Sequence, residues 1–305
     1  MPYFHLVFTL PHALHGLVAG HARILYECLF AAAASTLTEF ASDPRHLGGE
    51  PAFTLVLHTW KQDLGRHVHV HALVAGGALT AVTEGNPRGT GEWIHPKRGF
   101  LFPVKALSKV FRGKFVAALK RERTTGRLRH ALTDGAWRDL KTQLYAHDWV
   151  VYAKEPLGGP AQVLEYLGRY THRVAISNER IVGIDSNAVA FRVRANGAGG
   201  RKQTLRLAGD EFIGRFLLHV LPRGFKRIRH YGLLAPAHKC KRLAAARAAL
   251  AAPQPAPVLI ESIDAFLHRV AGIERAACPH CRGGCFAVVQ AIAPRRLAPP
   301  LRGPP

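Results

Sequence analysis

Three histidines occupy alternate positions in the stretch 65–77. Apolar residues separate His67, His69 and His71, and this period of two predicts a β-strand that ends at a glycine pair. Because alternate side chains of a strand share one face, neighbouring imidazoles lie roughly 6.6 Å apart along it. Imidazole nitrogen is a common metal ligand, so these side chains are candidates for holding one divalent ion. The alternative is a half-buried strand whose histidines bond to solvent or to the backbone.

A second segment with chemical potential carries two tyrosines one helical turn apart. A Pro- and Gly-rich breaker precedes it, and Pro160 suits the first position of a helix predicted over 161–171. Cations beside a tyrosine favour tyrosinate and could hold a phosphate against it, although a tyrosine that merely packs against its neighbours is the alternative. The polar side of this helix holds Gln162, Tyr166, Arg169, Tyr170 and Arg173.

The remaining hydrophobic pattern predicts an α+β chain that positions these segments. The strands at 53–60 and 65–77 are close enough to form a hairpin. Further strands are predicted at 3–10, 149–153, 180–184, 188–194 and 204–207, and helices at 13–41, 104–123, 134–147, 211–220, 237–252 and 258–270. We expect two domains: a catalytic domain over 1–235, and an Ala- and Pro-rich helical extension over 236–305 that holds a cysteine cluster.

The charge of the chain indicates a polyanionic partner. Forty-two Lys and Arg against 20 Asp and Glu give a net charge of +22, and nucleic acid is the polyanion that such a field favours. No apolar run of membrane-spanning length stands out, so a membrane partner is not expected. A small-molecule substrate is not expected either. The segment 223–231 is basic and aromatic, which suits phosphate contact and base stacking on single strands. Its predicted DNA contacts are Lys226, Arg227 and Arg229, and those of the helix at 104–123 are Lys109, Arg112 and Lys114.

The five cysteines, an odd number, are typical of a reducing compartment. Cys278 and Cys281, with Cys285 nearby, have the spacing of one half of a structural zinc site. A second such pair is absent from the sequence, so Cys240 or His238 would have to complete the site. Free thiols near the end of the chain are the alternative.

Several blocks of this sequence, in order, resemble the two-tyrosine HUH transposases of bacterial rolling-circle insertion sequences. The histidine strand with His69 and His71 and the pair Tyr166 and Tyr170 carry the chemical part of the resemblance. It extends over nearly all of residues 1–245, and its other blocks are 57–62, 102–114, 166–178 and 224–232. The resemblance implies a ferredoxin-like or RRM-like antiparallel sheet with helices packed on one side, and a location in the bacterial cytoplasm at the nucleoid.

The resemblance also implies a chemistry. His69 and His71 would hold Mg²⁺ or Mn²⁺, and a third ligand is expected, with Gln62 the first choice and Gln162 and His67 behind it. One tyrosine would attack the scissile phosphate of single-stranded DNA at the end of a mobile element and remain joined to the 5′ phosphate. Tyr166 is expected to act first and Tyr170 to serve strand transfer.

Members of this family usually carry a cysteine-rich, zinc-binding segment before the strand that begins here at Tyr3, and the present sequence has none at that place. The expectation is therefore a truncated form, and a non-catalytic nucleic-acid-binding remnant of a transposase is the principal alternative. A transposase of the three-carboxylate type is disfavoured because the acids are sparse and scattered. A zinc hydrolase using three histidines would need a general-base carboxylate that the sequence does not indicate.

Overall fold

The computed structural model describes residues 1–81, 91–96, 101–128, 130–157, 162, 168, 175–194, 201–253, 260–274, 278, 281, 289 and 290. The chain divides into two compact units, Met1–Pro253 and Gln254–Pro305. The first contains every described strand, and therefore the histidines singled out above.

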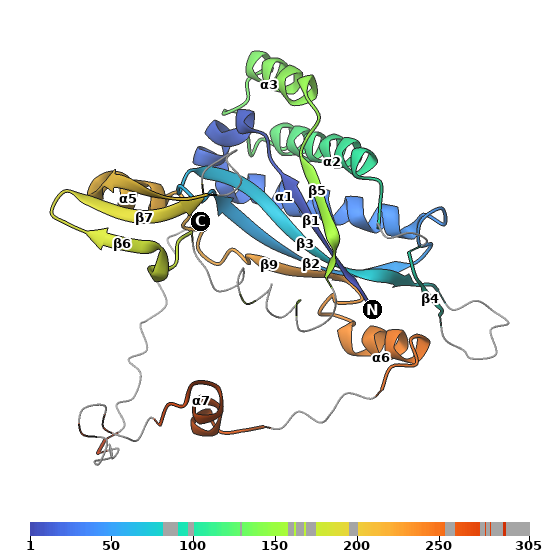
Figure 1. Cartoon of the computed structure of the whole chain (residues 1–305). Coiled ribbons are helices and arrows are strands. Elements are labelled where there is room, and N and C mark those ends of the chain that lie inside the picture. Colours follow the sequence, from blue (N-terminus) through green and yellow to red (C-terminus); the bar gives the residue numbers. More distant parts are fainter. Residues whose placement is uncertain are drawn as a thin grey trace. The chain divides into compact units, whose positions relative to one another are not determined.

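The main sheet of the first unit is antiparallel throughout (Figure 1). Its strand order is β5-β1-β3-β2-β9, and a short strand, β4, pairs with β3 off this path. The predicted hairpin is confirmed as β2 and β3, the two longest strands. The bounds are β1 Tyr3–Thr9, β2 Glu50–Trp60, β3 Arg66–Leu79, β4 Trp93–Ile94, β5 Val151–Leu157 and β9 Ile228–Gly232.

One face of this sheet forms the main core. Alternate residues of each central strand point to that face, among them Phe8 of β1, Leu55 of β2 and Val70 of β3, all less than 2% exposed. The intervening residues point to the opposite face. These include the histidines of β1, β2 and β3: His5, His58, His67, His69 and His71.

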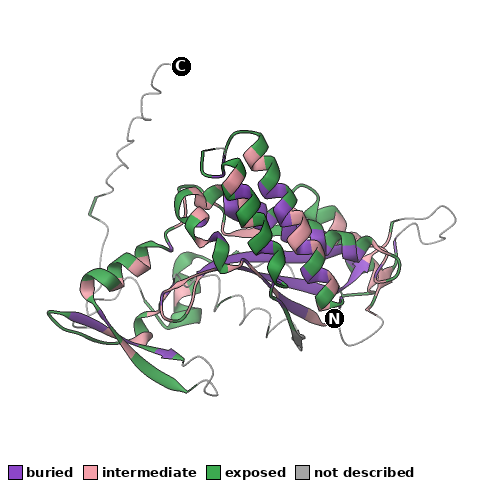
Figure 2. Cartoon of the chain, turned by 90° about the horizontal axis from the view of Figure 1, so that it is seen from above, coloured by how far each residue is buried: buried purple, intermediate pink, exposed green. Residues whose placement is uncertain are grey.

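Three helices pack over the core face (Figure 2). They are α1 (His15–Ser42, preceded by the 3-10 turn η1 at His12–Leu14), α2 (Val104–Thr124) and α3 (Asp134–Ala146). The segment His12–Ser42 is long and apolar enough to cross a membrane, contrary to our sequence-based expectation that no such run exists. Its apolar residues have a place in the fold, however, since Leu25, Leu29 and Phe30 are fully buried in the main core.

A second, smaller sheet in the first unit has the order β6-β7-β8 and is also antiparallel. Its core joins Phe191, Val193 and Leu207 to Leu64, which lies in the turn between β2 and β3. The small sheet therefore packs against the tip of the β2–β3 hairpin. Its elements are η2 Asn178–Arg180, β6 Ile181–Ile184, β7 Ala188–Arg194, β8 Lys202–Ala208 and the following helix α5 Gly209–Leu217.

Among the residues that the structure describes beyond β9, two further helices are present. In the first unit α6 (Lys239–Ala249) buries Ala246 beside Leu233, so this unit includes residues that we predicted to belong to the C-terminal extension. In the second unit α7 (Ile263–Ala271) begins at Ser262, whose hydroxyl accepts a hydrogen bond from the backbone N–H of Ala265, and ends at Gly272 with a left-handed backbone.

The expected α+β class and antiparallel sheet with helices on one side are confirmed. Three details differ. Strand β9 begins inside the basic segment 223–231, for which we predicted no strand, and ends one residue beyond it at Gly232. The strand predicted at 149–153 is instead Val151–Leu157 and continues through Pro156, and β4 lies in a stretch for which we predicted neither strand nor helix. The predicted helix at 161–171 lies outside the described residues except at positions 162 and 168.

Candidate functional site

The hairpin of β2 and β3 brings three histidines together. His58 pairs directly with His69 across the two strands, and His71 lies two residues further along β3 on the same face. One ring nitrogen from each of the three lies within 4.8 Å of the others, and Nε2 of His69 is 3.1 Å from Nε2 of His71. All three side chains are buried, with exposed fractions of 8% or less. We call His58, His69 and His71 the histidine triad.

The hydrogen bonds of His69 fix its tautomer. Its Nδ1 lies 2.8 Å from the backbone carbonyl oxygen of His67, and because a carbonyl only accepts, Nδ1 carries the proton. The lone pair of the neutral ring is then on Nε2, which points toward His71. Burial lowers the pKa of His69 to about 4, so the ring is neutral at neutral pH. Two nitrogens at right angles around an ion, with bonds of about 2.1 Å, are about 3 Å apart, so this pair fits a divalent metal.

His5 of β1 holds the ring of His71 from the other side. Its Nε2 lies 2.9 Å from Nδ1 of His71, and the two rings are stacked with centroids 5.1 Å apart. When Nε2 of His71 faces a metal ion, Nδ1 carries the proton and donates to His5. A hydrogen-bonded partner of this kind orients a metal-ligating histidine and raises its basicity.

The structure brings the predicted pair His69 and His71 together, but it does not place Gln62 with them as we expected. The amide oxygen of Gln62 accepts a hydrogen bond of 2.9 Å from the backbone N–H of Arg194, which fastens the hairpin tip to β7. His58 is instead the third imidazole. Sequence reasoning missed it because β2 shows a single histidine among apolar residues, although antiparallel pairing of the predicted hairpin was a signal that could have placed it opposite His69.

The two alternatives to Gln62 are His67 and Gln162. His67 is half-buried, with its ring centroid 4.9 Å from that of His69, and it does not belong to the triad. Gln162 is exposed. The predicted nucleophiles Tyr166 and Tyr170 and the neighbouring cations Arg169 and Arg173 lie outside the described residues.

The predicted DNA contacts of α2 belong to the helical layer, on the core side of the main sheet. Arg112 donates to the carbonyl of His147 and lies over the ring of Tyr145, and Lys114 forms an ion pair with Glu39. These two cations therefore hold α2 against neighbouring segments. Lys109 is exposed.

The basic segment 223–231 is more structural than its composition indicates. The guanidinium group of Arg229 lies 4.3 Å from the ring centroid of Phe30 and 4.9 Å from that of Phe225. Arg227 donates to the carbonyl of Leu57 and lies over Trp60. Of the three predicted contacts in this segment, Lys226 is the exposed one.

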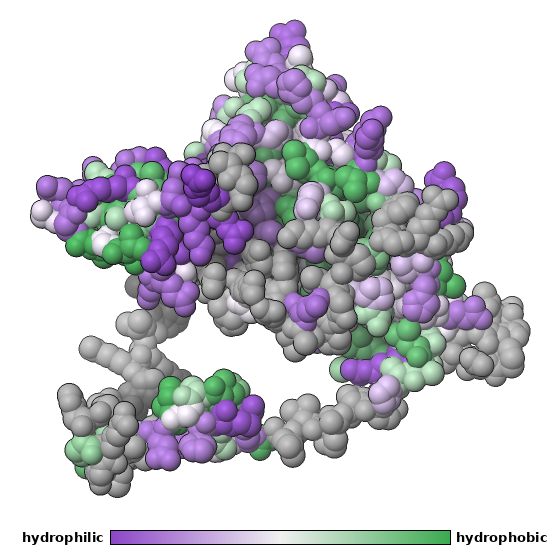
Figure 3. All heavy atoms as spheres, in the orientation of Figure 1, coloured by the Kyte–Doolittle hydropathy of each residue, from purple (hydrophilic) through white to green (hydrophobic). Residues whose placement is uncertain are grey.

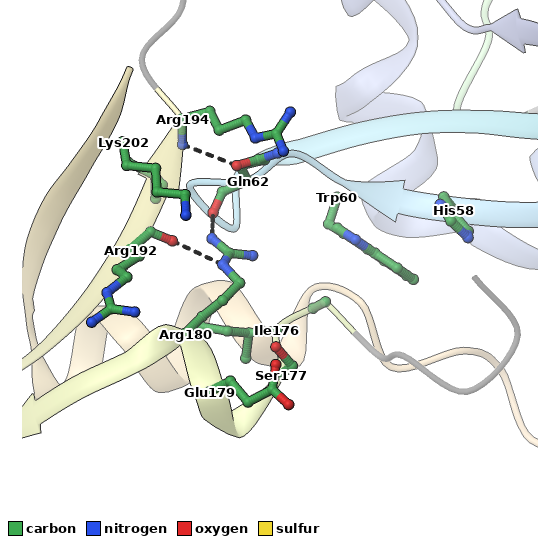
Figure 4. A pocket seen from close by; sticks show the side chains of 12 residues that line it. His58, Trp60, Gln62, Ile176, Ser177, Glu179, Arg180, Arg192, Arg194 and Lys202 are labelled. Atoms are coloured by element: carbon green, nitrogen blue, oxygen red, sulfur yellow. Dashed lines mark hydrogen bonds between the residues drawn. The ribbon is translucent and has the colours of Figure 1, made fainter. Parts of the chain in front are cut away.

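A pocket of about 490 Å³ adjoins the triad (Figure 4). His58 lines it together with Trp60 and Gln62 of the hairpin, and residues of the small sheet form its other wall. The rings of His58 and Trp60 are stacked with centroids 4.6 Å apart. The pocket therefore opens beside one of the three candidate metal ligands, His58.

The predicted zinc site remains a prediction. Cys278 is partly exposed and Cys281 exposed, and neither is in a disulfide with a described residue, nor is Cys240. Cys285 lies outside the described residues, and His238 directly precedes α6.

The fold and the site define an α+β protein with a buried histidine centre fit for a divalent ion. Residues 52–242 match the model of the Y2_Tnp family, described as "Putative transposase". The chain belongs to this transposase family.

Two relatives carry transposase names. The chain is 42% identical over 297 residues to "Putative transposase y4qJ" of Sinorhizobium fredii (strain NBRC 101917 / NGR234), which covers 94% of this chain and 73% of the relative. It is 27% identical over 244 residues to "Transposase for insertion sequence element IS801" of Pseudomonas savastanoi pv. phaseolicola. That alignment covers 77% of this chain and 54% of the relative.

Among solved structures, "Conjugative Relaxase TrwC in complex with mutant OriT Dna" aligns over 80% of this chain and 72% of its own. The sequence identity is 15% and the TM-score 0.28, so this likeness carries no argument.

Proposed function

We propose that this protein is an HUH-type transposase that cuts and transfers single strands of DNA at the ends of an insertion sequence. The observation that carries the proposal is the histidine triad, three buried imidazoles converging on one point in a member of a transposase family. The transposase names of the two relatives, including one from an insertion sequence element, point the same way.

His58, His69 and His71 would hold the ion, with His5 orienting His71. A bound divalent ion polarises the scissile phosphate and offsets the charge that builds up in the transition state. All three ligands are nitrogens, whereas Mg²⁺ takes oxygen ligands; divalent transition-metal ions bind nitrogen more readily, with Mn²⁺ the weakest of their series. We therefore infer that Mn²⁺ supports the reaction at least as well as Mg²⁺.

Tyr166 and Tyr170 are the proposed nucleophiles. The phenolate oxygen of one attacks phosphorus, the bond to the 3′ oxygen breaks, and that oxygen takes up a proton to become a free 3′-OH. The 5′ phosphate stays on the tyrosine as a diester, so a second 3′-OH can displace the tyrosine and restore a DNA linkage without ATP. Two tyrosines permit one such link to donor DNA and one to target DNA, with Tyr166 acting first.

The test is a search for a protein–DNA adduct that survives denaturant. Purified full chain is incubated with Mn²⁺ and a labelled, randomised pool of single-stranded oligonucleotides, and the adduct is resolved by denaturing electrophoresis. We expect an adduct with the native protein, none with the double variant Tyr166→Phe and Tyr170→Phe, and none with His69→Ala or His71→Ala. Retention of the oligonucleotides should survive in all variants because it depends on many cations.

Peptide mapping of the adduct assigns the order of the tyrosines. A nucleotide on Tyr166 supports the proposal, and one on Tyr170 alone reverses the order. Binding without any adduct would mean a nucleic-acid-binding protein that does not cleave, and the proposed activity would be wrong.

A further inference from the structure

The pocket beside the triad has a strongly cationic wall. Register places Arg194 opposite Lys202 on β8, and alternation along β7 places Arg192 on the same side as Arg194, while Phe191 and Val193 turn into the core of the small sheet. The pocket is lined by the cations Arg180, Arg192, Arg194 and Lys202 and by one carboxylate, that of Glu179.

Three of these cations keep their charge available. Among the described residues no carboxylate forms an ion pair with Arg192, Arg194 or Lys202, and all three are exposed. Arg206 of the same sheet contrasts with them, because Asp185 neutralises it at 2.6 Å. In the space-filling view, hydrophilic side chains gather where the small sheet adjoins the main one (Figure 3).

Hydrogen bonds fix this wall against the hairpin that carries the triad. The backbone N–H of Arg194 donates to the side chain of Gln62, and Arg180 donates both to the carbonyl of Arg192 and to that of Gln62 (Figure 4). From α5, Arg215 donates to the carbonyl of Asp63 at 3.0 Å. The cations are thus held at a fixed place relative to His58, which lines the same pocket.

We propose that this pocket, which we call the hairpin groove, receives the phosphate backbone of a single nucleic-acid strand and leads it to the histidine triad. Arg192, Arg194 and Lys202 contact its phosphates, and Trp60 lies between them and His58. A row of cations on adjoining strands, two of them roughly 6.6 Å apart along β7, suits the repeating charge of a polyanion. The inference rests on the proposed function, since it assumes that the triad acts on a phosphodiester.

The test is binding of labelled single-stranded oligothymidine to the full chain in EDTA, followed by fluorescence anisotropy over a range of salt. The groove variant replaces Arg192, Arg194 and Lys202 by Gln. The control replaces three exposed cations of the helical layer by Gln, namely Lys105, Lys120 and Lys141, and so changes the net charge equally. We expect a loss of affinity of roughly tenfold or more and a salt slope lower by about 2 in the groove variant, because each phosphate contact contributes about 0.7.

Equal losses in the two variants would overturn the proposal, because net charge alone would then explain the binding. Thymidine monophosphate that competes as strongly as the oligonucleotide would also overturn it and would indicate a small-molecule pocket. The Arg192→Lys and Arg194→Lys double variant should bind nearly as well as the native protein, and matching thermal melts establish that each variant is folded. Since no metal or cleavage is needed, loss of binding supports the groove even if no adduct forms, and normal binding refutes it even if cleavage occurs.

Discussion

The tautomer of His69 decides what the triad can bind. Its Nδ1 proton is committed to the carbonyl of His67, which leaves Nε2 as an acceptor facing His71. His58 completes the set from the neighbouring strand, while the side chain of Gln62 is committed to Arg194. Each of these roles follows from one hydrogen bond or one pairing position, so single substitutions can separate them.

We predict that His58→Ala weakens Mn²⁺ binding by at least roughly tenfold, whereas Gln62→Ala leaves Mn²⁺ affinity unchanged. Loss even of a residue that only orients a metal ligand typically costs 10- to 100-fold, and loss of a ligand should cost no less. Isothermal titration calorimetry measures both affinities, and thermal melts check folding. The reverse pattern, with Gln62→Ala the damaging change, would restore our sequence-based choice of third ligand.

At the scale of elements, the sequence predicted those parts whose pattern reflects their burial. The period of two in 53–60 and 65–77 predicted the hairpin because one face of each strand packs on the core. Strand β9 was missed because its arginines are typical of an exposed loop, whereas Arg229 in fact lies over two phenylalanine rings. The breaker that contains Pro156 was expected to follow the strand, but β5 continues through it: β5 is an edge strand of the described sheet, and its pairing with β1 shifts register at this place, between Tyr3 and His5. Edge strands and bulges are where a sheet accommodates proline.

The end of β9 depends on one glycine. Gly232 has a left-handed backbone with φ of +59°, and a Cβ built there would lie 1.8 Å from the carbonyl oxygen of Pro51. We predict that Gly232→Ala lowers the free energy of unfolding by more than about 2 kcal/mol, because the backbone strain of about 1–2 kcal/mol adds to a clash with backbone. Gly224→Ala is the matched control. The φ of Gly224 is +72°, but nothing lies within 4 Å of a Cβ built there, so only the backbone strain remains. Urea unfolding compares the two, and equal losses would contradict the role of Pro51.

His219 makes the attachment of the hairpin tip sensitive to pH. Its Nε2–H donates to the carbonyl of Leu64 and its Nδ1 accepts from the hydroxyl of Thr59, which requires the neutral ring. Burial lowers the pKa of His219 below the ordinary 6.5. At pH values between the lowered pKa of the folded state and 6.5, the unfolded chain binds more protons at His219 than the folded chain does. The contribution of His219 to stability is therefore complete above pH 6.5 and is lost as the pH falls.

We therefore predict that the stability difference between the native protein and His219→Phe narrows as the pH falls below 6.5, by at most about 1.4 kcal/mol per pH unit. Urea unfolding at a series of pH values measures the difference. Other histidines titrate in both proteins and cancel. A difference that stays constant across this range would contradict a buried neutral His219.

For the whole molecule, a net charge of +22 favours a polyanionic partner such as nucleic acid. Composition alone predicted a polyanionic partner, but it did not predict where the cations act. Arg112, Lys114 and Arg229 are occupied by internal contacts. The cations of the hairpin groove lie on β7 and β8, which the sequence predicted only as strands at 188–194 and 204–207. Whether a cation is exposed or occupied depends on partners that are far apart from it in sequence, and composition does not show these partners.

We predict that affinity for single-stranded DNA falls steeply with salt, with a slope of log affinity against log salt near −0.7 for each phosphate contacted. Fluorescence anisotropy from low to moderate salt measures the slope. A peptide nucleic acid of the same bases, which has no phosphates, is the control and should bind weakly at every salt concentration. A flat dependence for DNA would mean that the charge of the chain serves another purpose.

The fastening of the hairpin tip to the small sheet has a thermodynamic consequence. The same rigid hairpin carries His58 and His69 at one place and is hydrogen-bonded through Gln62 to the strand of Arg192 and Arg194 at another. Occupancy of the triad and occupancy of the groove therefore act on one element. By reciprocity, whatever factor a bound strand contributes to the affinity for Mn²⁺, Mn²⁺ must contribute to the affinity for the strand, so measuring either affinity with and without the other ligand gives the same coupling free energy.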